Sequence, residues 1–142
     1  MARTLERAGL QVVASDLHDY GYGVSGIDAR RLEPPIESIV TNPPYTLAAE
    51  MLLHFLAIYT KKIALLLRLS FLESKKRYPL FQRHPPSRVY VFPERLSLAP
   101  RGVILQGGGT ISYGWFLWEK DTTGDTLLRW LPVGFKCNEV LG

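Results

Sequence analysis

The most informative stretch is Ile36-Glu37-Ser38-Ile39-Val40-Thr41-Asn42-Pro43-Pro44-Tyr45. Its first six residues are rich in β-branched apolar types and predict a strand. Two successive prolines then fix two φ angles at about −65° and remove two backbone donors, so the loop that follows the strand is rigid. Apolar residues at three- and four-residue spacing from Leu47 to Ile58 predict a helix over 47–59. The stretch is therefore typical of an α/β sheet, with the loop at the strand's carboxyl end.

Elements on either side of this stretch extend the sheet. Residues 3–9 read as the end of a helix that Gly9 caps in the left-handed conformation. Glycines at 21, 23 and 26 make residues 17–35 irregular. Strand, helix, strand and a late pair of strands indicate an α/β sheet with an antiparallel edge. The further strands that we expect are Gln11–Asp16, Ile63–Leu69, Arg88–Phe92 and Gly114–Trp118.

Length and composition favour one domain over residues 1–142, because 46% of the residues are apolar. Cys137 is the single cysteine of the sequence, which excludes an internal disulfide and favours a reducing compartment. The first residues lack the apolar region of a signal peptide, and the longest apolar run, 63–67, is too short to span a membrane. We expect a soluble cytoplasmic protein that does not bind membranes.

The chemistry of the loop points to recognition of a planar amino compound. Asn42 offers a side-chain carbonyl acceptor, the prolines offer free backbone carbonyls, and Tyr45 offers a flat π face with a polar tip. A base amino group or a carboxamide suits this combination. A Pro-rich turn with a packed tyrosine is the alternative. His54 and His84 belong to no Cys/His cluster with ligand spacing, so we predict no metal site.

Asn42-Pro43-Pro44-Tyr45 resembles motif IV, the catalytic loop of the S-adenosylmethionine-dependent amino-methyltransferases that modify adenine N6, cytosine N4 or glutamine side chains. The resemblance to phage- and prophage-type DNA methyltransferases extends over about residues 8 to 120. It implies a Rossmann-like methyltransferase sheet with antiparallel C-terminal edge strands, and S-adenosylmethionine as cofactor. The segments that carry it are 13–16, 19–23, 39–45, 65–74, 89–95 and 113–118.

The resemblance also implies roles for single residues. Asn42 and the Pro43 carbonyl accept hydrogen bonds from the target NH2, and Tyr45 stacks on the target ring, in a catalytic loop that includes Pro44. Asn42 borders the cofactor as well.

Two acidic residues match the family's cofactor contacts. Asp16, with Leu17 beside it, matches the residue that accepts hydrogen bonds from the ribose hydroxyls. Asp28, with Ala29 beside it, matches the residue that contacts the cofactor's adenine amino group. For both aspartates a helix cap or a turn residue is the alternative reading.

The family's motif I, a first strand followed by a Gly-rich turn, has no match in the sequence. We therefore expect an N-terminally truncated, partial methyltransferase domain whose first strand is missing. Unpaired strand edges recruit partners, so the expected consequence is a homo-oligomer or a second polypeptide that completes the sheet.

The charge favours a polyanionic partner, and we expect DNA. The formal net charge is +4 and the pI is near 9.3. Basic residues cluster between 75 and 101, where an ordinary solvated loop is the alternative. The predicted DNA contacts are Lys75, Lys76, Arg77 and Arg83, and the cluster extends to Arg95 and Arg101.

Three functions remain open. The first is methyl transfer to an amino nitrogen, with adenine N6 in DNA as the favoured target. The second is a catalytically silent domain that binds nucleic acid or pairs with another subunit. The third is methylation of a protein glutamine, for which the same four-residue loop serves.

Overall fold

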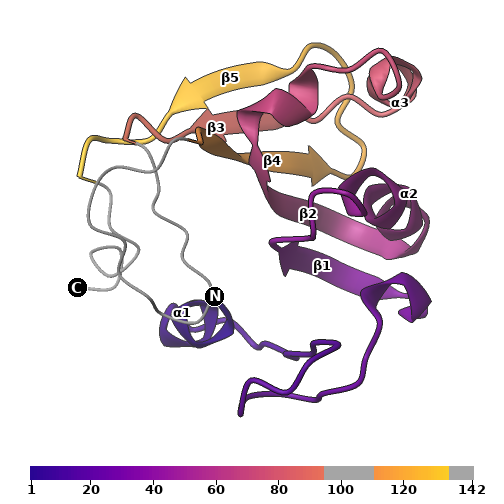
Figure 1. Cartoon of the computed structure of the whole chain (residues 1–142), viewed down its shortest axis with the longest axis vertical. Helices are drawn as coiled ribbons and strands as arrows, with labels where there is room; N and C mark the ends of the chain where they lie inside the picture. The colour runs from indigo at the N-terminus through magenta and orange to yellow at the C-terminus, as the bar shows by residue number, and fades with distance from the viewer. Residues whose placement is uncertain (95–110, 135–142) are drawn as a thin grey trace.

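The computed structural model describes residues 1–94 and 111–134 (Figure 1). Arg95, Arg101, Cys137 and the end of the resembling segment 89–95 lie outside them. A five-stranded mixed sheet has the order β1-β2-β4-β3-β5, which confirms the α/β class. The elements are α1 (Ala2–Arg7), η1 (Ala29–Arg31), β1 (Ile36–Thr41), α2 (Ala48–Ile58), β2 (Tyr59–Arg68), η2 (Leu69–Leu72), α3 (Tyr78–Arg83), β3 (Arg88–Val91), β4 (Tyr113–Glu119) and β5 (Leu127–Trp130).

The central unit is β1-α2-β2, in which the helix carries the chain between two parallel strands. The predicted helix over 47–59 is confirmed, and Met51, Leu52 and Phe55 on its inner side are buried. They pack in one cluster with β2 residues and with Phe116 of β4. Figure 1 shows α2 lying against the β1 and β2 part of the sheet. The helix thereby holds the carboxyl ends of β1 and β2 side by side.

The predicted antiparallel edge is wrong in its position. β4 does run antiparallel, but it lies inside the sheet between β2 and β3. Its residues alternate between buried and half-buried, so both of its faces are at least partly covered, as an inner strand requires. The strand at that side of the sheet is β5, which pairs in parallel with β3 and is exposed at every residue.

The predicted strand Gln11–Asp16 is wrong. This segment has one isolated bridge, between Ser15 and Val24, and the Val13 side chain is 92% exposed. A strand satisfies its backbone groups through neighbouring strands, and the described residues offer it only the short turn back to Val24. The prediction for Gly9 is confirmed, because its φ of +81° is left-handed and its N–H donates to the Glu6 carbonyl.

β1 forms one end of the sheet order, so within the described residues only its β2 side is paired. Pairing of this edge with another copy or another chain stays a prediction. None of the described helices is long and apolar enough to cross a membrane.

Candidate functional site

The Asn42–Tyr45 loop lies where β1 ends, next to the end of β2. The two strands are parallel, and Thr41 pairs with Leu65, so their carboxyl ends reach the same edge of the sheet. Pro43 is buried, whereas Asn42 is exposed. The Pro44 carbonyl accepts a hydrogen bond from the Leu47 N–H at 2.9 Å, which ties the loop to the start of α2. The sequence prediction of a rigid loop at a strand end is therefore confirmed in its position.

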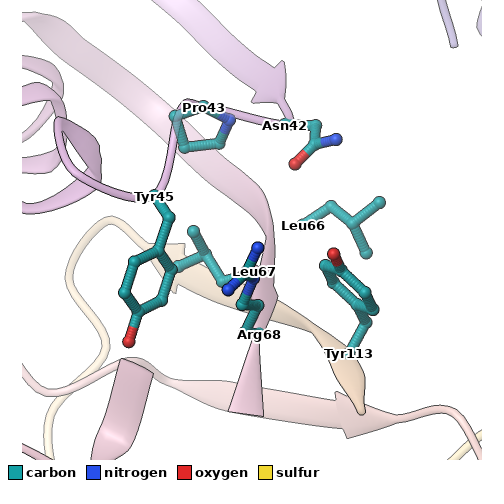
Figure 2. A pocket seen from close by; sticks show the side chains of 7 residues that line it. All are labelled: Asn42, Pro43, Tyr45, Leu66, Leu67, Arg68 and Tyr113. Atoms are coloured by element: carbon teal, nitrogen blue, oxygen red, sulfur yellow. The ribbon is translucent and has the colours of Figure 1, made fainter. Parts of the chain in front are cut away.

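A pocket of about 160 Å³ opens beside this loop (Figure 2). It lies where three segments meet, namely the loop after β1, the last three residues of β2 and the first residue of β4. Small-molecule sites commonly measure about 300–1,000 Å³, so this pocket has room for one planar ring or one amide group. Its lining residues are Asn42, Pro43, Tyr45, Leu66, Leu67, Arg68 and Tyr113.

Tyr45 is held in place at its hydroxyl end. Its Oη lies 3.3 Å from Ser70 Oγ and accepts a hydrogen bond of 3.3 Å from Arg77 Nη2. The ring meets Phe71 edge-on, with the centroids 6.2 Å apart at 79°. Figure 2 shows this ring forming one wall of the pocket. These contacts fix the plane on which a flat ligand can stack.

The Arg77 side chain forms hydrogen bonds with the protein's own backbone. Its Nε donates to the Phe71 carbonyl at 2.7 Å, and its Nη2 donates to the carbonyls of Ser70 and Glu73 at 3.0 and 3.1 Å. Its guanidinium carbon lies 4.6 Å from the Phe71 ring centroid. A single half-buried side chain thus joins the 70–73 turn to Tyr45. Sequence reasoning assigned Arg77 to DNA, and it missed this internal role.

We expect Arg77→Lys to lower the free energy of unfolding by about 1–3 kcal/mol. A lysine ammonium is a single compact donor and cannot reach the carbonyls of Ser70, Phe71 and Glu73 together. Urea denaturation of both proteins measures the difference. Lys76→Met is the matched control, because the Lys76 side chain is exposed and should change stability by no more than about 0.5 kcal/mol. Equal losses in the two variants would contradict the role of Arg77.

The other predicted DNA contacts lie on the surface. Lys75 and Lys76 precede α3, and Arg83 is its last residue, and all three are exposed. Lys75 and Lys76 come directly before Arg77, whose guanidinium contacts Tyr45, so these two lysines lie near the pocket loop. Arg83 lies farther away, because the carbonyl of the next residue, His84, accepts a hydrogen bond from Trp118 at the opposite end of β4.

Of the predicted cofactor residues, Asn42 lines the pocket, whereas Asp16, Leu17, Asp28 and Ala29 do not. Asp16 is exposed and accepts a hydrogen bond of 2.9 Å from the His18 N–H, as a turn residue does. Leu17 is 56% exposed. The described residues therefore do not bring Asp16 and Leu17 together with Asn42 at the pocket.

Asp28 caps the η1 turn. Its carboxylate accepts from the Arg30 backbone N–H at 3.0 Å and forms an ion pair with the Arg30 guanidinium at 2.7 Å. The side-chain hydrogen bond from Arg30 is the main cause that lowers the pKa of Asp28 to about 2. Ala29 packs against the core. Asp28 thus has the cap geometry that the sequence left as the alternative, with its carboxylate oxygens engaged by Arg30.

Sequence reasoning missed Arg68 and Tyr113. Arg68 is the last residue of β2 and the last but one of the predicted strand Ile63–Leu69, so the rule that parallel strands share a carboxyl edge could have found it. Tyr113 could not be found in this way, because it depends on β4 entering the sheet beside β2. Among residues 1–94 and 111–134, no group of three His, Cys, Asp or Glu side chains could hold a metal ion.

Comparisons with protein-family models, with curated proteins and with solved structures gave no match for this chain.

Proposed function

We propose that this protein is a Rossmann-like, S-adenosylmethionine-dependent amino-methyltransferase that acts on adenine N6 in DNA, and that the described residues supply its target pocket. The observation that carries the proposal is the pocket itself. Asn42, Pro43 and Tyr45 surround a space for one planar ring at the carboxyl ends of two parallel strands. Ligands of open α/β sheets bind at this edge.

The loop residues act by holding the target. Asn42 Oδ1 and the Pro43 carbonyl accept hydrogen bonds from the two amino hydrogens, while the base stacks on Tyr45. An amino nitrogen held in this way directs its lone pair out of the base plane. S-adenosylmethionine, when bound, supplies the methyl group. Orientation and fixed dipoles can provide most of the rate enhancement, and the loop needs no strong general base.

Adenine in a duplex has to leave the base stack to reach such a pocket, at a cost of a few kcal/mol. Stacking on an aromatic side chain contributes about 1–3 kcal/mol per base and offsets part of this cost. The exposed cations Lys75 and Lys76 lie on the segment next to the pocket loop, and together with the exposed Arg83 they suit contacts with DNA phosphates. This basic segment favours DNA over a protein glutamine as the target.

A second candidate is a catalytically silent domain that binds nucleic acid or pairs with another subunit. One observation favours it, namely that Asp16, Leu17, Asp28 and Ala29 lie outside the pocket that contains Asn42. A domain of this kind keeps target recognition without methyl transfer.

Calorimetric titration of S-adenosylmethionine into the purified chain, with Asp16→Ala beside it, tests the cofactor part. We expect saturable binding to the wild type and weaker binding to the variant. Transfer of a labelled methyl group to DNA then tests the reaction, with label expected on adenine N6. Absence of cofactor binding and of transfer, together with retained DNA binding, would favour the silent domain. Transfer to glutamine peptides alone would replace the DNA target.

A further inference from the structure

Two arginines lie against the Tyr45 ring, and they differ in how they are used. The guanidinium carbons of Arg68 and Arg77 lie 5.2 and 5.6 Å from the ring centroid. The donors of Arg77 reach backbone carbonyls and the Tyr45 hydroxyl. The Arg68 backbone pairs with Tyr113, whereas the Arg68 side chain forms no hydrogen bond and no ion pair in the described part of the chain. Among the described residues, the whole Arg68 guanidinium is thus left for a ligand, whereas the Nε and Nη2 groups of Arg77 are engaged within the protein.

Arg68 is placed to use these donors in the pocket. It is the last residue of β2 and one of the lining residues. Figure 2 shows its guanidinium between the rings of Tyr45 and Tyr113. A guanidinium carries five N–H donors and no acceptor. The pocket thus combines acceptors from the loop with donors from the end of β2.

A ligand that pairs with both the loop acceptors and the Arg68 donors carries an amino group and a neighbouring acceptor in one plane. Adenine has this pattern, because N7 is an acceptor beside the N6 amino group on its major-groove edge, and N1 lies on the other side of the same carbon. A phosphate would satisfy Arg68 as well. Lys75, Lys76 and Arg83 are exposed and open to phosphates, whereas Arg68 lies over the Tyr45 ring inside the pocket.

We propose that Arg68 is a specificity-determining residue, which donates a hydrogen bond to a ring nitrogen next to the target amino group. The proposal rests on the proposed function and adds a second requirement to it. The pocket selects an amino group with an acceptor beside it, and on binding the guanidinium moves from the face of Tyr45, which the base then occupies, to the edge of the bound base.

Fluorescence anisotropy with short single-stranded thymidine oligonucleotides tests the proposal without the cost of base flipping. Each oligonucleotide carries one central adenine, 7-deazaadenine, 1-deazaadenine or abasic site. The wild type should prefer adenine to the abasic site, and one deaza analogue should bind about tenfold more weakly. Arg68→Met should lose a similar factor on adenine and should no longer distinguish adenine from that analogue.

Arg68→Lys separates charge from geometry. It keeps the positive charge, so its salt dependence should match the wild type, but it should lose most of the discrimination between adenine and the analogue. The Arg68 side chain is exposed, so thermal unfolding of both variants should match the wild type.

Three results would overturn the proposal. Retained discrimination in Arg68→Met would remove Arg68 from base recognition. Equal weakening on adenine and abasic oligonucleotides, with a reduced salt slope, would assign Arg68 to a phosphate. A wild type with no preference for adenine over the abasic site would remove the target pocket, and with it both the proposed function and this inference.

Discussion

Asn42→Ala is expected to lower kcat/KM for methyl transfer by at least about a hundredfold, the loss typical of removing one fixed polar group at a reacting centre. Asn42 supplies the one side-chain carbonyl of the pocket, and an alanine leaves the target amino group held by the Pro43 carbonyl alone. The free energy of unfolding should stay within about 0.5 kcal/mol, because Asn42 is exposed. Initial rates with labelled donor and urea denaturation measure the two quantities.

Asn42→Asp is the matched control for this loss. An aspartate has the same length and keeps acceptor oxygens in place of the amide carbonyl, so part of the activity should remain. The alanine variant should also lose the preference for adenine over an abasic site. An unchanged rate in Asn42→Ala would remove the loop from the mechanism. A lower rate accompanied by a lower unfolding midpoint would indicate damage to the fold instead.

Local patterns predicted the elements that support the loop. The strand Ile36–Thr41 has the predicted bounds, and the helix differs by one residue at each end. Period-two and period-3.6 patterns are properties of neighbouring residues, so a single sequence carries them. The position of Asn42 followed as well, because the prolines end the strand and the next helix returns the chain to a parallel neighbour.

Features that depend on distant partners could not be predicted in the same way. Residues 11–16 have the composition of a strand, but their backbone lacks a neighbouring strand among the described residues. β5 follows a short turn and is exposed, so no alternating pattern marked it. Arg68 and Arg77 are both arginines that lie near the Tyr45 ring. Their roles differ because the backbone carbonyls of residues 70–73 lie within hydrogen-bond distance of Arg77. Composition therefore finds basic residues without finding their function.

Phe71→Ala is expected to lower the free energy of unfolding by about 3–5 kcal/mol. Its side chain is fully buried and meets the rings of Tyr45, Phe81 and Phe116 edge-on, at centroid distances of 6.2, 5.8 and 6.1 Å. An alanine removes the ring and leaves a cavity among these neighbours. Domains are commonly stable by about 5–15 kcal/mol, so the variant should unfold at a much lower urea concentration.

Two further variants show whether the loss of stability in Phe71→Ala depends on the buried position of Phe71. Phe71→Leu keeps most of the volume and should lose less stability, while Phe81→Ala removes a half-buried ring at the rim and should also cost less. Because Phe71 also supports Tyr45 and the Arg77 guanidinium, Phe71→Leu should weaken adenine binding although the protein stays folded. Equal losses for the two alanine variants would mean that the fully buried position of Phe71 does not set the size of the effect. Unchanged adenine binding in Phe71→Leu would mean that Tyr45 is held by its hydroxyl contacts and not by the core.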